Sequence, residues 1–228
     1  RAFADRLREC DAALLPLTGF SVEAVLRGGD DWLARVEVVQ PVLWAVGVAL
    51  TAWWESFGVV PAAVVGHSQG EVVAAVVAGA LTVEDGARVV AARSGALVDL
   101  VGDGGMLSVG APVADVVRWL EPSGGWGDLS VAADNGPSQV VVAGERSRLA
   151  AFVPWCEERG VRARLVEVRY ASHSPQVEQV REAVVAGLVG VRGAVPRVPW
   201  FSTVTGERVT EPVDAAYWWS NLRDQVRF

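Results

Sequence analysis

The stretch that decides the fold is residues 62–71, which read Ala-Ala-Val-Val-Gly-His-Ser-Gln-Gly-Glu. Its first four residues, Ala62 to Val65, are small and apolar and predict a buried strand, and the apolar run from Val72 to Ala80 predicts a helix. The pattern G-x-S-x-G lies between them, with Ser68 at its centre. A strand, a sharp glycine turn and a helix are together typical of a nucleophile elbow. We therefore expect Ser68 at the tip of this turn, in a strained backbone.

The neighbours of Ser68 suit this turn. Gly66 and Gly70 are expected to leave room for it, because they carry no side chain. At the start of a helix, the helix N-terminus and the backbone N–H of Gln69 can stabilise an oxyanion. The alternative is a tight turn with a buried serine, since G-x-S-x-G often occurs by chance. The strand before the pattern and the helix after it favour the nucleophile.

The composition indicates a folded chain of ordinary domain size. The 228 residues are 51% hydrophobic and 21% charged, which suits one large domain, or one that carries a smaller inserted unit. The formal net charge is −7, and all 20 basic residues are arginines scattered along the chain, which argues against a nucleic-acid partner. The longest apolar run, Val72 to Leu81, is too short to cross a bilayer, so we expect no membrane partner.

Cysteine and histidine are rare in this sequence. Cys10 and Cys156 lie far apart without metal-ligand spacing, so we expect buried structural thiols, no metal site and no disulfide framework. No signal peptide is visible, and the expected location is the cytoplasm. The two histidines are His67 and His173, so an imidazole that activates Ser68 has to be one of them.

The chain is expected to have three parts. Residues 1–105 and 170–228 predict a large α/β unit, and residues 106–169 predict a smaller unit inserted into it. The insertion has the order β-α-β-β-α-β of a ferredoxin-like unit. Two such bodies leave a cleft between them, where ligands usually bind. The predicted strands of the insertion are 106–109, 129–133, 139–143 and 162–168, and its helices are 112–120 and 146–159.

Outside the insertion the sequence predicts mainly helices. Ala2 to Leu14 is amphipathic, Val42 to Phe57 is long and apolar, and Thr82 is expected to cap a helix that runs to about Leu100. Val59 to Val65 is predicted as the strand that leads into the elbow. No strand precedes the first helix, so we expect the sequence to begin inside a domain, with an N-terminal segment of that domain missing from it.

A serine nucleophile needs a base, and the base needs an orienting group. His67 is adjacent to Ser68, so its side chain points away from the tip of the elbow and a packing role is expected. His173 lies in a predicted loop at the return from the insertion and is the better base, although a structural role is an equal alternative. No aspartate stands out as the orienting group, which a backbone carbonyl can replace.

Arg93 is the remaining candidate from the residues alone. It lies on an apolar helical face with Val89, Val90 and Leu97. One interpretation is an arginine that reaches solvent or pairs with a surface acid. The functional interpretation is a bidentate clamp for a substrate carboxylate, with Ser68 as nucleophile toward an acyl group that carries this carboxylate.

Four segments together resemble a known family. They are Gly66 to Glu71, Arg93-Ser94, Tyr170-Ala171-Ser172-His173 and Tyr217 to Arg223. In sequence and joint spacing they are similar to the acyltransferase domain of modular type I polyketide synthases, of the malonyl-CoA:acyl carrier protein transacylase family. The resemblance runs along essentially the whole chain. It implies an α/β fold, with a large domain like the α/β-hydrolase core and an inserted ferredoxin-like subdomain.

The resemblance also implies roles for individual residues. Ser68 would carry the acyl group, and His173 would act as general base and acid. A backbone carbonyl at the position of Asn221 would hold the histidine, and Arg93 would pair with the malonyl carboxylate. The chemistry would be ping-pong, from an acyl-CoA to the phosphopantetheine thiol of an acyl carrier protein, with no bound cofactor and with ketosynthase and other synthase domains as neighbours.

One segment of the family pattern is not found in this sequence. A Gly-Gln-Gly segment near the family's N-terminus completes the oxyanion hole, and without it Gln69 is the only donor that we can name. Losing one such donor costs about 2.7–4 kcal/mol in other enzymes.

The extender unit is implied by the segment Tyr170 to His173. In the family, Tyr-Ala-Ser-His goes with methylmalonyl units and His-Ala-Phe-His with malonyl units. Ser172 leaves space for a methyl group that a phenylalanine would fill. Gln69 and the segment Arg35 to Gln40 also resemble the methylmalonyl pattern. One methyl group gives only about 1–3 kcal/mol of discrimination, so malonyl, ethylmalonyl and other larger units stay as alternatives.

Three other functions compete with this interpretation. A serine hydrolase or editing thioesterase could use the same elbow, but it has no use for Arg93. A non-catalytic scaffold module of a synthase is disfavoured because Ser68, His173 and Arg93 are all present. A loading domain for propionyl-type starters is disfavoured because those starters carry no carboxylate for Arg93 to bind.

Overall fold

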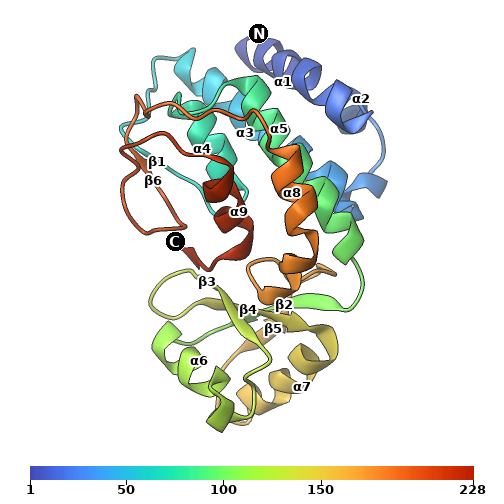
Figure 1. Cartoon of the computed structure of the whole chain (residues 1–228), viewed down its shortest axis with the longest axis vertical. Helices are drawn as coiled ribbons and strands as arrows, with labels where there is room; N and C mark the ends of the chain where they lie inside the picture. The colour runs from blue at the N-terminus through green and yellow to red at the C-terminus, as the bar shows by residue number, and fades with distance from the viewer. The chain divides into compact units, whose positions relative to one another are not determined.

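The computed structural model describes residues 1–228, which fold as two compact units. The large unit comprises residues 1–98 and 182–219, and the small unit comprises residues 99–181 and 220–228 (Figure 1). The mixture of helices and strands confirms the predicted α/β class.

The large unit is mainly helical. Three of its helices, α1 (Ala2–Thr18), α3 (Val36–Glu55) and α5 (Val83–Leu97), pack against one another and bury Leu14, Trp44 and Val90. The prediction of helices in these three places is confirmed. The other helices are α2 (Val22–Arg27), α4 (Gly70–Val77), α8 (Arg181–Gly187) and α9 (Ala215–Arg223), with a 3-10 turn at Asp31–Ala34. The last residues of α9, from Ser220, belong to the small unit, and a 3-10 turn at Val98–Leu100 lies at the boundary between the units.

The predicted starts of two of these helices, α3 and α5, had different outcomes. The helix α3 begins at Val36 rather than Val42 and continues through Pro41. Val36 and Val38 are buried, so their packing outweighs the hydrogen bond that a proline inside a helix removes. At the start of α5, Thr82 Oγ1 accepts a hydrogen bond from the Asp85 N–H at 3.0 Å, which confirms the predicted cap.

The sheet of the large unit has two strands, β1 (Val64–Val65) and β6 (Trp200–Phe201). They are parallel, and Val64 pairs with Trp200. The predicted strand from Val59 was too long at its N-terminal end. Only two residues of β1 find a partner, because β6 is equally short, and Pro61 has no N–H to donate to a ladder.

The helix α3 is long and apolar enough to cross a membrane by length and composition alone. Half of its most apolar stretch is buried inside the protein, as in the core helices of soluble proteins, so this is weak evidence for a membrane span.

The small unit contains the predicted β-α-β-β-α-β order. Its sheet has the strand order β5-β2-β4-β3-β7, and all neighbouring pairs are antiparallel except β3 and β7. The helices α6 and α7 cover one face of this sheet (Figure 1) and bury a core that includes Leu107, Val142 and Phe152. The elements are β2 (Gly104–Val109), α6 (Val113–Leu120), β3 (Ser130–Asp134), β4 (Val140–Glu145), α7 (Arg146–Glu157), β5 (Ala163–Leu165) and β7 (Val226–Arg227), with 3-10 turns at Pro122–Gly124 and Pro175–Val180.

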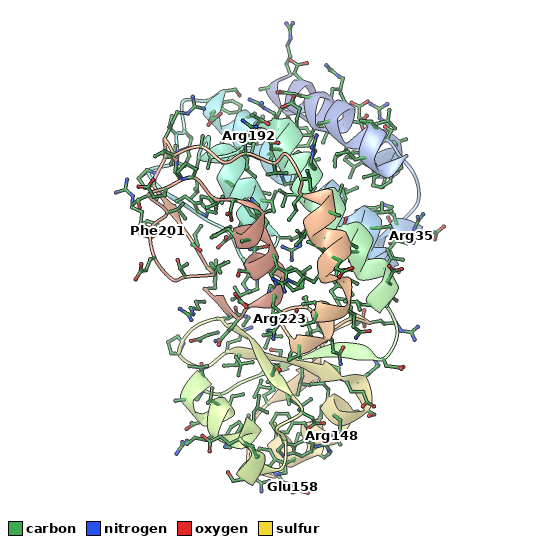
Figure 2. All side chains as sticks on the ribbon, in the orientation of Figure 1. Arg35, Arg148, Glu158, Arg192, Phe201 and Arg223 are labelled. Atoms are coloured by element: carbon green, nitrogen blue, oxygen red, sulfur yellow. The ribbon has the colours of Figure 1, made fainter.

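Two arginine side chains stack on tryptophan rings in the small unit, near its helices. The guanidinium of Arg148 (Figure 2) lies 4.7 Å from the centre of the Trp126 ring and also pairs with Asp128. The guanidinium of Arg159 lies 3.8 Å from the centre of the Trp155 ring. Such contacts stabilise a cation over an aromatic face.

The small unit extends beyond the predicted boundaries of 106–169. It takes in residues 99–105 and 170–181 and the C-terminal residues 220–228. The C-terminal segment belongs to it because β7 pairs with β3, with Val226 opposite Ala133. A second contact joins the C-terminal segment to the small unit: the His173 N–H donates a hydrogen bond to the Leu222 carbonyl oxygen at 3.0 Å.

Candidate active site

Ser68 lies in a sharp turn between β1 and α4. Its φ angle is 54°, in the left-handed region that non-glycine residues seldom adopt, as the sequence predicted. Two backbone bonds close the turn: the Gly70 N–H donates to the His67 carbonyl at 2.9 Å, and the Glu71 N–H donates to the Ser68 carbonyl at 3.0 Å. Gln69 precedes the first residue of α4, so its own N–H lies at a helix N-terminus.

The two glycines of the turn have different roles. A Cβ atom on Gly66 would lie 2.2 Å from the carbonyl carbon and oxygen of Gly70, a distance at which no side chain fits. A Cβ atom on Gly70 would meet nothing within 4 Å. The expectation that both glycines make room for the turn therefore holds for Gly66 and is wrong for Gly70.

Arg93 lies beside Ser68. Its side chain is buried, with 3% exposure, and its Nη2 donates to Ser68 Oγ at 3.2 Å. The apolar face of α5 continues around it with Val89, Val90 and Leu97, all buried. This burial rules out the interpretation of Arg93 as an arginine that reaches solvent. The fork of N–H donors on its guanidinium has the geometry to bind a carboxylate.

His173 is the second non-glycine residue with a positive φ, of 58°. It is 4% exposed, and its Nδ1 lies 2.8 Å from the backbone carbonyl oxygen of Asp224. A carbonyl oxygen can only accept, so Nδ1 carries a hydrogen, and in the neutral imidazole the lone pair is then on Nε2. The neutral imidazole can therefore accept a proton at Nε2.

The backbone carbonyl of Asp224 at Nδ1 orients the His173 ring, the role for which no aspartate side chain was found in the sequence. The resemblance had pointed to the carbonyl of Asn221 instead. Asn221 is buried, with 2% exposure, and lies on the same C-terminal segment, in α9. Sequence reasoning missed Asp224 because a backbone carbonyl leaves no signal in the choice of side chain. The role of Asn221 stays a prediction.

The residues that precede His173 are held closely against β2. Ser172 is buried, Tyr170 is half-buried, and the Ser174 hydroxyl donates to the Ala171 carbonyl at 2.7 Å. A Cβ atom on Gly104 would lie 2.7 Å from the Ala171 nitrogen, so this strand approaches the segment as closely as a glycine allows. The backbone of the segment is therefore fixed within the small unit.

The candidate residues divide between the two units. Ser68, Gln69 and Arg93 belong to the large unit, and the structure brings the side chains of Ser68 and Arg93 together. Residues 170–173 and Asn221 belong to the small unit. No group of His, Cys, Asp and Glu side chains in residues 1–228 is arranged to hold a metal ion.

A polar cluster behind the elbow was not predicted. It consists of Glu71, Ser202, Thr203 and Tyr217, and we call it the Glu71 cluster. Glu71 is 0% exposed, and its carboxyl contacts the Thr203 N–H, the Thr203 hydroxyl and the Tyr217 hydroxyl. A charged residue among the apolar residues of α4 was a signal for such partners, since a buried carboxyl requires hydrogen bonds.

Comparison with known proteins identifies the family. The family model described as acyl transferase domain matches residues 1–228. The polyketide synthase GfsE of Streptomyces halstedii is 52% identical over 228 residues, which is 99% of this chain and 6% of that protein. Erythronolide synthase EryA3 of Saccharopolyspora erythraea is 49% identical over 229 residues, which is 99% of this chain and 7% of that protein.

The fold is shared with a solved acyltransferase domain. The domain from module 8 of the salinomycin polyketide synthase has a TM-score of 0.95 and 48% sequence identity, over 100% of this chain and 54% of that one. The chain thus spans about half of that solved domain and a small fraction of the synthases that it resembles. On its sequence and its fold, the chain belongs to the acyl transferase domain family of modular polyketide synthases.

Proposed function

We propose that this chain loads an extender unit, methylmalonyl, from its coenzyme A thioester onto Ser68 and then onto the phosphopantetheine thiol of an acyl carrier protein. The observation that carries the proposal is the pair of Ser68 and Arg93: a serine with φ of 54° whose Oγ lies 3.2 Å from a buried guanidinium. A serine alone would suit many acyl groups. A buried cation beside it favours an acyl group with its own carboxylate.

The proposed first half-reaction begins with proton transfer. Nε2 of His173 accepts the hydroxyl proton of Ser68 as Oγ attacks the thioester carbonyl carbon, which forms a tetrahedral oxyanion. The N–H of Gln69 at the start of α4 stabilises the negative charge. The C–S bond then breaks, the coenzyme A sulfur takes the proton from His173, and the acyl group remains on Ser68 as an ester.

The second half-reaction reverses these roles. His173 takes the proton of the phosphopantetheine thiol, and the thiolate attacks the ester carbonyl. The C–O bond to Ser68 breaks, and the serine oxygen recovers the proton from His173. The carbonyl of Asp224 supports both halves, because it keeps the hydrogen on Nδ1 and leaves Nε2 for the reacting groups.

The choice of methylmalonyl rests on the segment from Tyr170 to His173. Ser172 is small and buried, so it leaves space that a phenylalanine would fill. A single methyl group contributes only about 1–3 kcal/mol to such a choice, so malonyl and ethylmalonyl are the alternatives to test.

The proposed partners follow from the chemistry and from the relatives. An acyl carrier protein receives the acyl group, a ketosynthase and other synthase domains are neighbours, and no cofactor stays bound. We propose a cytoplasmic location without membrane or nucleic-acid partners. Packing of α3 against α1 and α5 supports the absence of a membrane partner, since it buries Trp44, Ala45 and Val48 of that helix inside the protein.

The test is the intact mass of the synthase module that contains this chain, after brief incubation with equal methylmalonyl-CoA and malonyl-CoA. A methylmalonyl adduct that is absent in Ser68→Ala supports the nucleophile, the reaction and the extender together. A malonyl adduct keeps the reaction and overturns the extender. Hydrolysis of both thioesters without an adduct favours a serine hydrolase or editing thioesterase. Neither adduct nor turnover favours a scaffold module.

A further inference from the structure

The carboxyl of Glu71 is fully buried behind the elbow, and the proposed acyl transfer does not use it. Glu71 lies in the first turn of α4, directly after the G-x-S-x-G pattern. Oε1 contacts both the backbone N–H and the hydroxyl of Thr203, the latter at 2.7 Å, and Oε2 contacts the Tyr217 hydroxyl. Thr203 follows β6, and Tyr217 lies on α9, so the carboxyl joins three elements of the large unit.

No positive charge accompanies this carboxyl. The groups that face it are the amide and hydroxyl of Thr203, the amide of Val204 and the hydroxyl of Tyr217, and only Tyr217 among them can titrate. Removal from water raises the pKa of Glu71 above its ordinary value, although the hydrogen bonds from Tyr217, Thr203 and the Val204 N–H oppose this. Burial likewise raises the pKa of Tyr217, which therefore keeps its hydrogen.

The hydroxyl hydrogens of the Glu71 cluster can be counted. Thr203 Oγ1 lies 2.7 Å from Glu71 Oε1 and 2.9 Å from the Gly66 carbonyl oxygen, and its single hydrogen can serve only one of them. The Tyr217 hydroxyl contacts Glu71 Oε2 and also Ser202 Oγ, at 2.6 Å. Ser202 Oγ accepts from the N–H groups of Val204 and Thr205, so its own hydrogen is available for Tyr217.

An ionised Glu71 cannot satisfy all of these contacts. If the carboxylate takes the Thr203 hydrogen, the Gly66 carbonyl loses it, and if Gly66 takes it, the two oxygens 2.7 Å apart face each other without a hydrogen. A neutral Glu71 with its hydrogen on Oε1 satisfies every hydroxyl contact, and the carboxyl oxygens still accept from the N–H groups of Thr203 and Val204. Glu71 donates to Thr203, Thr203 donates to Gly66, Ser202 donates to Tyr217, and Tyr217 donates to Oε2.

We propose that Glu71 is a neutral carboxylic acid at physiological pH and a positioning residue for Ser68, because its hydrogen frees that of Thr203 to hold the Gly66 carbonyl. Gly66 is where the turn is tightest, since its Cβ position overlaps the Gly70 backbone. Fixing its carbonyl fixes the peptide that leads through His67 into the strained Ser68. This inference rests on the proposed role of Ser68 as the nucleophile.

The first test observes the proton directly. Infrared spectroscopy of the synthase module, with 13C-labelled glutamate, is expected to show the band of a protonated carboxyl at about pH 7.5. The band disappears in Glu71→Gln and persists in Glu84→Gln, a matched control because Glu84 also lies in the first turn of a helix, α5, but is exposed. A wild-type spectrum without that band overturns the proposal, whatever the activity.

The second test measures positioning through Ser68 acylation. In Glu71→Gln, the Thr203 N–H requires the amide oxygen, not the NH2 group, at the position of Oε1. That oxygen can accept a hydrogen bond from the Thr203 hydroxyl but cannot donate one, so the hydroxyl hydrogen no longer holds the Gly66 carbonyl. Glu71→Gln and Thr203→Val are therefore each expected to slow acylation roughly three- to tenfold, with KM for the thioester unchanged. Because both break the same chain of hydrogen bonds, the double variant is expected to be no slower than either single variant.

Multiplied losses in the double variant, or a change in KM with the rate constant intact, contradict the chain of hydrogen bonds. Failure of the proposed function is separate from these outcomes. If the wild-type module forms no adduct on Ser68, the acyl transfer is wrong, while the carboxyl band still reports the state of Glu71.

Discussion

Ser68 and His173 are the two non-glycine residues of this chain with a positive φ. Such a backbone costs of the order of 1–3 kcal/mol per residue and persists only where the surroundings impose it. At Ser68 the bonds that close the elbow impose it, and at His173 the contacts with Leu222 and Asp224 do so. Both strained residues are proposed reacting groups, and packing alone does not explain why the strain lies at these two positions.

Arg93→Ala is expected to reduce kcat/KM for methylmalonyl-CoA roughly 10- to 100-fold, since a hydrogen bond to a charged group contributes about 1.5–3 kcal/mol. Propionyl-CoA, which has no carboxylate, should lose much less, since it loses only the effect of the Arg93 contact with Ser68 Oγ, so its relative rate rises. Steady-state kinetics with both thioesters measures this. Arg88→Ala, on the same helix but exposed, is the control. Equal losses for the two thioesters would contradict a carboxylate clamp.

Gly66→Ala is expected to lower the free energy of unfolding by about 3 kcal/mol or more, because its methyl group would overlap the Gly70 backbone, which cannot move aside. Gly70→Ala meets nothing within 4 Å and should change stability by no more than about 1 kcal/mol. Urea unfolding of both variants makes the comparison. Equal stabilities would mean that the turn relaxes more easily than the overlap implies.

At the scale of elements, the helix ends depend on local chemistry and the strands depend on partners. The start of α5 at Val83 follows from Thr82, whose side chain replaces a missing backbone acceptor. The start of β1 follows from the length of β6, which is far away in the sequence. The start of α5 was therefore easier to predict from the sequence than the start of β1.

Thr82→Ala is expected to cost about 1 kcal/mol of stability, because the Asp85 N–H loses its acceptor at the start of α5. Thr210→Ala, at an exposed position outside any helix or strand, is the control and should change stability little. Thermal unfolding at neutral pH measures both variants. If the two melt together, the cap does not limit the stability of the large unit.

At the scale of the whole molecule, each unit has its own core and its own cysteine. Cys10 lies in the core of the large unit and Cys156 in that of the small unit, and both side chains are fully buried. Burial raises the pKa of the Cys10 thiol to about 12 and that of the Cys156 thiol to about 11. Both are free thiols, as the sequence predicted.

The raised thiol pKa values predict a loss of stability at alkaline pH. An unfolded cysteine ionises near its ordinary value of 9.0, while the folded thiols stay protonated up to about 11 and 12. The unfolded state therefore binds fewer protons above pH 9, and the free energy of unfolding falls as pH rises from there. Urea titrations across this range measure the slope. The double variant Cys10→Ala/Cys156→Ala should have a shallower slope, and an unchanged slope would assign the loss to other groups.

The sequence by itself determined what depends on neighbours along the chain. The elbow at Ser68, the cap at Thr82 and the β-α-β-β-α-β order of the small unit follow from local pattern, because turn chemistry and hydrophobic periodicity act over a few residues. The position of Arg93 on an apolar helical face follows from the same periodicity, although its burial was only one of two interpretations of the sequence. These features gave the fold class and most of the candidate site.

Only the tertiary structure decided what depends on distant backbone groups. Glu71 meets Thr203 across 132 residues and Tyr217 across 146, and the carbonyl at His173 Nδ1 comes from Asp224. The C-terminal residues join the small unit through pairing of β7 with β3. A hydrogen bond needs only a donor and an acceptor at the right distance, and every residue except proline offers both in its backbone. Which of them meet is therefore decided by packing of the whole chain.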